Sequence, residues 1–444
     1  MNASPISDHE LEGIFAPLAG YGSWALAVSG GADSTALMHL AARWRDIAAA
    51  KVKITVLTVD HGLRAEAARE ADHVARIAAA LGLAQETLPW QGIKPTTGIQ
   101  AAAREARYDL MTRHAHAHAI DCLATAHHLD DQAETIVMRL KRGSGPDGLS
   151  GIAQTSYWAG VPLIRPLLDI AGARLRATLI AAGIDWVEDP GNSDERFERV
   201  RVRKAMAALE QAGLAAGDFA LTARRMRRAR AALDGATQDF LRRCARLADE
   251  GYCALDRAGF AAVPEEIALR ALGRSLEAVS GVPSPLSLAK LEALTQGLRD
   301  GEERARTLAG CKVTMRKHEI LVVREAGRRG LGEVELHPGE QVLWDRRFTV
   351  AASTRASSPV TVKALGDKGF SEVRARLRRP VGLPADAAHT LASIWRGTRL
   401  VAVPLLGFDV SATGPGATKG SGNSYTARFV NTHSFRHAQV EVST

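Results

Sequence analysis

The sequence has little cysteine, no secretion signal and no long apolar run. Its four cysteines, Cys122, Cys244, Cys253 and Cys311, form no C-x-x-C pair, which argues against a zinc knuckle and a disulfide framework. The first residues, MNASPISDHE, lack the basic and apolar regions of a signal peptide. No apolar run reaches the roughly 18 residues that a membrane helix needs. We therefore expect a cytoplasmic protein without a membrane partner.

Acidic residues are outnumbered by basic ones. The 57 lysines and arginines exceed the 49 acidic residues, so the formal net charge is +8. This excess favours a polyanion such as a nucleic acid as partner, because basic side chains neutralise phosphates. The 444 residues allow roughly two to four domains.

Segments of strand and helix character alternate between residues 20 and 190. Apolar segments at 23–29, 53–60 and 120–126 predict strands, and Ala-rich segments at 34–49, 65–81 and 99–119 predict helices. This alternation predicts a doubly wound α/β fold with a mostly parallel sheet.

The later sequence changes character twice. We expect a catalytic domain over 1–205, a helical middle domain over 206–300 and a small C-terminal domain, mixed or mostly β, over 301–444. Within the last domain, 310–325 reads as two strands around a turn. The Gly/Ser-rich stretch near 411–425 predicts a mobile loop.

The segment SGGADS (29–34) stands between a predicted strand and a predicted helix. Gly30 and Gly31 let the backbone approach a phosphate where the N–H groups of the first helical turn point outward. The hydroxyls of Ser29 and Ser34 add donors. Asp33 would repel a phosphate, but it fits a Mg²⁺ ion that bridges to one. The segment matches neither the Walker pattern nor the dinucleotide pattern G-x-G-x-x-G.

Polar residues also follow the next two predicted strands, where ligands bind in an open parallel sheet. TVDHGLR (58–64) brings Asp60, His61 and Arg64 to this edge, and a turn with solvated charges is the alternative explanation.

ATAHHLDDQAET (124–135) is the densest polar cluster in the chain. If a helix begins near Asp130, Asp131 and Glu134 share one face. Helix capping explains one of these carboxylates better than all of them. We expect one of His127 and His128 to bind a phosphate or base and the other to be structural.

His114 and His118 are four residues apart on a predicted helix. Such a pair can bind a transition metal, but no third ligand has a suitable spacing nearby. The prediction is a solvated helix face.

Several of these segments together resemble tRNA(Ile)-lysidine synthases, a family within the N-type ATP pyrophosphatases of the PP-loop superfamily. They are SGGADS, VDHGLR (59–64), AAAREARYDLM (101–111), ATAHHLDDQAET with RGSGPDGLSGI (142–152), IRPLLD (164–169) and WVEDPGNSD (186–194). The resemblance covers about residues 20–205, and only the general layout agrees beyond.

The resemblance implies an ATP- and Mg²⁺-dependent ligase acting on the tRNA(Ile) that bears a CAU anticodon. The enzyme would adenylate the oxygen on carbon 2 of the first anticodon cytidine and release pyrophosphate. The ε-amine of free L-lysine would then displace AMP and form lysidine, so that the tRNA reads AUA instead of AUG. A homodimer is compatible with the sequence and is not required by it.

We assign roles on this basis. The nucleotide site comprises Ser29, Gly30, Gly31, Ala32, Asp33, Ser34, Asp60, His61 and His127, with Asp33 holding Mg²⁺. Asp131 and Glu134 are the candidates for binding the lysine ammonium and accepting its proton. Phosphate or tRNA contacts are expected from Arg64, Arg104, Arg107, Arg199, Arg201, Arg203, Arg224 and Arg228.

Two features of the later sequence qualify this interpretation. Val200 stands where the family commonly has asparagine, in NSDERFERVRVRK (192–204). TARRMRRARAAL (222–233) carries five arginines that spread around a helix, so some must be solvated or paired with acids, and we expect at least two to contact tRNA. The alternatives are a tRNA thiolase of the same superfamily, which typically has paired cysteines, and an RNA-binding module with an inactive nucleotide site.

Overall fold

The computed structural model describes most of the chain. The described residues are 3–48, 51–62, 67–92, 94–95, 97–188, 196, 198–281, 287–328, 330–354, 356, 358–377, 382–410 and 424–430. The predictions for Arg64, for Asn192 and Asp194, and for most of the stretch 411–425 fall outside them. Contacts divide the described residues into two compact units, one up to residue 231 and one from residue 232 onward. None of the described helices is both long and apolar enough to cross a membrane.

The first unit is the predicted doubly wound α/β domain. Its strands are β1 (Ser23–Ala27), β2 (Lys53–Asp60), β3 (Ala84–Pro89), β4 (Cys122–Ala124), β5 (Thr155–Trp158) and β6 (Val161–Ile164). Its helices are α1 (Asp8–Phe15), η1 (Ala16–Leu18), α2 (Ala32–Ile47), α3 (Ala67–Ala80), α4 (Ile99–Ala117), α5 (Leu129–Lys141), α6 (Pro146–Leu149), α7 (Gly172–Ala182) and α8 (Glu198–Gln211).

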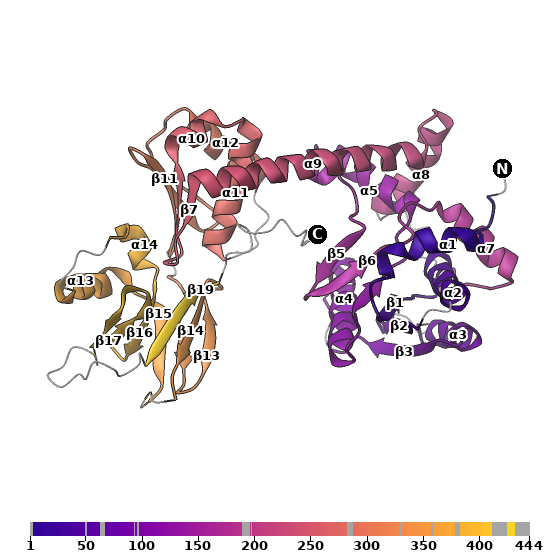
Figure 1. The fold of residues 1–444 in the computed structure, drawn as a ribbon, viewed down its shortest axis with the longest axis horizontal. Coiled ribbons are helices and arrows are strands. Elements are labelled where there is room, and N and C mark those ends of the chain that lie inside the picture. Colours follow the sequence, from indigo (N-terminus) through magenta and orange to yellow (C-terminus); the bar gives the residue numbers. More distant parts are fainter. Residues whose placement is uncertain are drawn as a thin grey trace. The chain divides into compact units, whose positions relative to one another are not determined.

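The sheet has the order β3-β2-β1-β4-β6-β5, and its strands are parallel except for β5. Helices cover both faces (Figure 1): α1, α2 and α7 pack around Trp24 and Leu26, whereas Tyr108 and Met111 of α4 pack on the opposite face with Leu123. Strand β2 is a run of apolar and β-branched residues because a parallel strand is covered on both faces. Strands β1, β2, β4 and β6 end at one edge of this sheet.

The described residues of the second unit form three antiparallel sheets. Helix α9 (Ala216–Cys244) contributes to both units. The other helices are α10 (Arg257–Ala262), α11 (Glu265–Ser280), α12 (Leu288–Arg299), α13 (Gly366–Arg376), α14 (Ala385–His389) and η3 (Pro404–Leu406). The strands are β7 (Ala245–Leu247), β8 (Cys253–Asp256), β9 (Arg306–Leu308), β10 (Cys311–Met315), β11 (Glu319–Arg324), β12 (Val334–Leu336), β13 (Gln341–Trp344), β14 (Phe348–Ala352), β15 (Val360–Ala364), β16 (Ala392–Arg396), β17 (Arg399–Val403), β18 (Phe408–Asp409) and β19 (Tyr425–Phe429).

Sequence and structure agree on the coarse layout of this unit. The two strands expected at 310–325 form the antiparallel pair β10 and β11. Strands β7 and β8 arise within the segment expected to be helical, and they join the sheet β7-β8-β11-β10-β9. The proposed domain boundaries near 205 and 300 stay predictions.

Candidate active site

The glycine-rich segment forms the turn between β1 and α2. Gly30 has φ +90°, a conformation that favours glycine, and a Cβ there would lie 3.4 Å from the Val74 side chain. The Ser34 hydroxyl donates to the Gly31 carbonyl at 3.0 Å and accepts the Ser29 N–H at 3.2 Å, so it closes the turn. Intrahelical bonding begins with the Thr35 N–H, which leaves the preceding N–H groups of α2 without intrahelical acceptors, as in a helix N-terminus that binds an anion.

Asp33 joins this turn to the segment that follows β4. Its Oδ2 lies 3.3 Å from Nε2 of His128, the residue that caps α5. The Asp130 N–H donates to Nδ1 of His128, so Nε2 carries the proton that faces Asp33. The other Asp33 oxygen, Oδ1, is buried without a hydrogen-bond partner among the described residues. An orphaned carboxylate oxygen beside a phosphate-type turn fits a Mg²⁺ ligand.

The capping of α5 uses His128 and the carboxylate of Asp131, a structural arrangement of the kind expected for one of the two histidines. Asp131 Oδ2 accepts the His128 N–H at 3.0 Å, which completes a capping box. Asp130 instead accepts the N–H of Gly172 at the start of α7, at 3.2 Å. Asp131 thus combines a capping bond with an ion pair to Arg199, whose Nη2 lies 3.3 Å from its Oδ1.

Glu134 is buried between two arginines of α8. Its side chain is 2% exposed, and its oxygens accept Nε–H of Arg199 at 2.9 Å and of Arg203 at 2.7 Å. Glu134 therefore anchors both arginines in the present arrangement, and Arg199 is held by Asp131 as well. Arg199 and Arg203, which were expected to face phosphate, are therefore engaged by carboxylates, whereas Arg201 donates to the Arg196 carbonyl at 2.9 Å.

The charges around this cluster shift its pKa values in opposite directions. Burial disfavours a charged His128, but the carboxylates of Asp33, Asp131 and Asp130 outweigh it and raise the pKa of His128. Burial opposes ionisation of Asp131, yet His128, His127 and Arg199 lower the pKa of that carboxyl. Asp131 is accordingly an ionised carboxylate at neutral pH, suited to binding a cation.

A second group of side chains lies at the ends of β2 and β4. Asp60 accepts the N–H of Gly62 at 2.7 Å and so forms the turn after β2. His61 lies edge-on to Trp90, and its Nε2 is 3.5 Å from Nη2 of Arg107. Because arginine only donates, Nδ1 carries the His61 proton, and this atom is buried without a partner among the described residues. Burial and Arg107 lower the pKa of His61 to about 4.

His127 lies among basic groups on the same edge. Burial above all lowers its pKa to about 3, and Arg165, Arg104 and Arg199 add to the effect. Its Nδ1 pairs with the Thr125 hydroxyl at 2.9 Å. Arg165 is 5% exposed and donates to the Ala153 carbonyl at 2.8 Å. The Nε atoms of Arg104 and Arg165 are buried without partners in the described part of the chain, as phosphate donors would be.

Arg165 was not selected in the sequence analysis, although the position of this residue after a strand predicts it. Arg165 directly follows β6, as Asp60 ends β2 and His127 follows β4, and residues at the carboxyl ends of parallel strands share one edge. Tyr108 was also missed. Its ring lies 5.2 Å from the Arg104 guanidinium.

The arginines of α9 divide into paired and unpaired groups. Arg224 pairs with Asp169 at 3.2 Å, Arg227 donates to the Ser150 carbonyl at 3.0 Å, and Arg230 pairs with Asp147 at 3.2 Å. Arg225 and Arg228 are exposed and form no hydrogen bond or ion pair with described residues. The paired members confirm that some of the five are bound to acids.

Comparison with known proteins identifies the fold family. The PP-loop domain family matches residues 4–210. A tRNA(Ile)-lysidine synthase from Bradyrhizobium sp. is 45% identical over 350 residues, which cover 74% of this chain and 97% of that protein. One from Ruegeria pomeroyi is 41% identical over 86% of this chain and 88% of its own length. Among solved structures, a U34-tRNA thiolase from Methanococcus maripaludis is 17% identical with a TM-score of 0.43, and the match covers 50% of this chain and 77% of that one.

Cys122 bears on the thiolase alternative. It is fully buried within β4, and burial raises the pKa of its thiol to about 12, so it does not provide a reactive thiolate. The identity to lysidine synthases extends across most of the chain, beyond the PP-loop domain itself. The chain belongs to the tRNA(Ile)-lysidine synthase family.

Proposed function

We propose that the chain is an ATP-dependent ligase that converts the first anticodon cytidine of CAU-anticodon tRNA(Ile) to lysidine. In the first step, the cytosine O2 attacks the α-phosphorus of ATP and pyrophosphate leaves. In the second step, the ε-amine of free L-lysine attacks carbon 2, the bond from carbon 2 to O2 breaks and AMP leaves. The supporting observation concerns Asp33, His61, Arg104 and Arg165, which follow β1, β2, β3 and β6 respectively in the parallel sheet. Each has a buried polar atom without a partner among the described residues.

The turn after β1 is suited to the pyrophosphate of ATP. Gly30 and Gly31 keep Cβ atoms away from it, and the first N–H groups of α2 supply donors. Asp33 would hold Mg²⁺ through its orphaned oxygen, and the ion would neutralise charge that develops on the leaving pyrophosphate. His128 fixes the Asp33 carboxylate from the other side at 3.3 Å.

The two candidate lysine-binding carboxylates take different roles in this proposal. Lysine has a reference pKa of about 10.4, so forming its neutral amine at pH 7 costs roughly 4–5 kcal/mol. Asp131 remains ionised and binds the ammonium close to the reacting carbon. Glu134 is occupied by Arg199 and Arg203 and positions them. In this proposal Asp131, rather than Glu134, accepts the proton that lysine loses.

The basic group near His127 is suited to the adenylate phosphate and the cytosine. Arg104 and Arg165 offer N–H donors, and neutral His127 can donate to a base or accept from it without adding charge. A base inside the anticodon loop must leave its stack to reach such a site. The exposed Arg225 and Arg228 of α9 are the candidates for contacts to the tRNA backbone.

The direct test supplies the purified chain with Mg-ATP, radiolabelled lysine and transcribed tRNA(Ile) with a CAU anticodon. Methionine tRNA, which shares that anticodon, is the matched control. Label in the isoleucine tRNA alone is the expected result. Pyrophosphate release that depends on tRNA but leaves no label would mean that the nucleophile is wrong. If neither product forms, an RNA-binding module with an inactive nucleotide site becomes the better explanation.

A further inference from the structure

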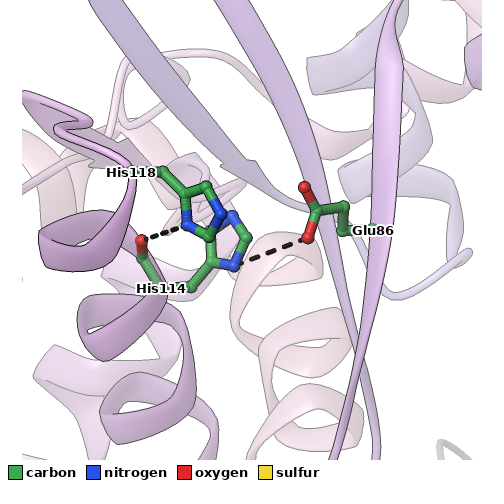
Figure 2. Close-up of side chains that lie close together, drawn as sticks. All are labelled: Glu86, His114 and His118. Carbon is green, nitrogen blue, oxygen red and sulfur yellow. Dashed lines mark hydrogen bonds and ion pairs between the residues drawn. The ribbon is translucent and has the colours of Figure 1, made fainter.

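A cluster of three metal-binding side chains lies away from the strand ends that form the candidate active site. His114 lies in the last turn of α4, His118 is the C-cap residue of that helix, and Glu86 comes from the edge strand β3 (Figure 2). One nitrogen or oxygen of each side chain lies within 4.8 Å of those of the other two. The sequence expectation of a solvated helix face is wrong for His114, whose side chain is 7% exposed.

We propose that Glu86, His114 and His118 bind a divalent transition-metal ion of the Zn²⁺ class, with water completing the coordination. Two imidazoles and a carboxylate are ligands that Zn²⁺ accepts. At bonds of about 2.0–2.1 Å, two ligand atoms of a tetrahedral ion are about 3.3 Å apart. The distance from His114 Nδ1 to Glu86 Oε2 is already 3.6 Å, so this pair needs little movement.

The hydrogen bonding of His118 supports the same assignment. Its Nδ1 lies 3.0 Å from the carbonyl oxygen of His114, and a carbonyl can only accept. Nδ1 therefore carries the proton, and the Nε2 lone pair remains for a metal. Metal-binding histidines are commonly oriented by a carbonyl in this way. Figure 2 shows the two rings next to Glu86; they are stacked, with an interplanar angle of 19° and centroids 4.0 Å apart, so one ring must turn for both lone pairs to reach the same ion.

The surroundings favour ligation and indicate a structural role. Glu86 and His118 are the ionisable groups that act on His114, whose side chain is largely buried. Strand β3 lies at the edge of the sheet and pairs only with β2 among the described strands. A metal ion would add a direct link between this edge and α4.

The test uses the full-length chain, stripped with a chelator and titrated with Zn²⁺ against a chromophoric competitor, at pH 7.5 with excess Mg²⁺ and no ATP. We expect one tight site per chain, at least tenfold weaker binding in His118→Ala and a smaller loss in Glu86→Gln. His116→Ala is the matched control, since His116 lies on the same helix and its Nε2 instead pairs with the Ala159 carbonyl at 2.8 Å.

A second measurement separates this site from other metal sites in the chain. Zn²⁺ should raise the thermal midpoint of the wild type and of His116→Ala, but not that of His118→Ala. Equal Zn²⁺ affinity in His118→Ala and His116→Ala would overturn the proposal, as would a wild type that binds only at millimolar Zn²⁺. Neither readout depends on the lysine-transfer reaction.

Discussion

Each unit of the molecule contains a cluster of arginines and carboxylates. The two clusters differ in whether all of their buried polar atoms have hydrogen-bond partners. In the second unit, Asp345 accepts Arg324 through both oxygens at 3.1 Å and Arg347 Nε at 2.7 Å. Arg347 is fully buried, and its Nη2 donates to the Thr390 carbonyl at 2.8 Å. This closed cluster holds two guanidinium groups and one carboxylate, and its remaining guanidinium N–H groups donate to backbone carbonyls of the same unit.

The cluster in the first unit is open, in the sense that some of its buried polar atoms have no partner among the described residues. Glu134 is as well paired as Asp345, but Asp33 keeps an unpartnered buried oxygen, and Arg104 and Arg165 keep unpartnered nitrogens among the described residues. Such atoms cost free energy unless a ligand satisfies them. Burial of charge alone therefore does not distinguish a binding site from a structural ion cluster, whereas incomplete hydrogen bonding does.

The largest effect is expected from opening the closed cluster. Asp345→Ala leaves the buried Arg347 without its carboxylate and should lower the free energy of unfolding by about 3–5 kcal/mol. Hydrogen-exchange mass spectrometry of peptides from 311–350 would report the loss. The control Glu372→Ala removes an exposed 3.0 Å pair with Arg376 and should cost less than about 1 kcal/mol. Equal losses in both variants would contradict the structural role of Asp345.

The reverse pattern is expected at Asp33. Asp33→Asn removes the proposed Mg²⁺ ligand and should slow tRNA-dependent pyrophosphate release by about a hundredfold to a thousandfold. Unfolding should change little, because Oδ1 has no partner among the described residues and an amide oxygen can still accept the His128 Nε2–H in place of Oδ2. Asp46→Asn, at an exposed position on the same helix, is the control. Undiminished pyrophosphate release in Asp33→Asn would refute the magnesium role.

For the open cluster, the sequence predicts the strands that position the side chains better than it predicts the ion pairs between those side chains. Strands β1, β2 and β4 were predicted from apolar segments between Ala-rich helices. Because parallel strands end at one edge of the sheet, Asp33, Asp60 and His127 were expected to lie together. Strand β3, AQETLP, was not predicted because an edge strand with exposed positions lacks the apolar run of a central strand.

Charge pairing across long sequence separations escaped prediction for a different reason. Arg199 and Arg203 looked like phosphate ligands, but they bind Glu134, which is 65 and 69 residues away in sequence. The third candidate ligand near His114 likewise comes from Glu86, in another element. A single sequence gives the charged residues, whereas the tertiary structure determines which of them form ion pairs.

A moderate effect is expected where the first unit exposes basic groups without partners. Replacing Arg225 and Arg228 together by alanine should weaken tRNA binding and reduce the slope of log K against log salt by about 1.5, at roughly 0.7–0.9 per phosphate contact. Filter binding at several salt concentrations measures it. Lysine at both positions keeps the charge and should keep the slope. A slope unchanged by alanine would remove these residues from the interface.

The smallest effect is expected on the pH dependence of stability in the first unit, which contains the open cluster. His61 and His127 are buried as neutral groups with pKa values of about 4 and about 3, whereas an unfolded histidine titrates near 6.5. Between these values the unfolded chain binds more protons, so the stability of the first unit should fall as pH falls from about 6.5 to about 4. His128 acts oppositely, because its raised pKa stabilises the fold below about 6.5 and loses that effect at higher pH. Protection factors for hydrogen exchange in peptides from 23–60, which correct for the slower intrinsic exchange at acid pH, should therefore decrease between about pH 6.5 and about pH 4 in the wild type and decrease less in His127→Asn. Identical pH profiles of the protection factors would contradict a buried neutral His127.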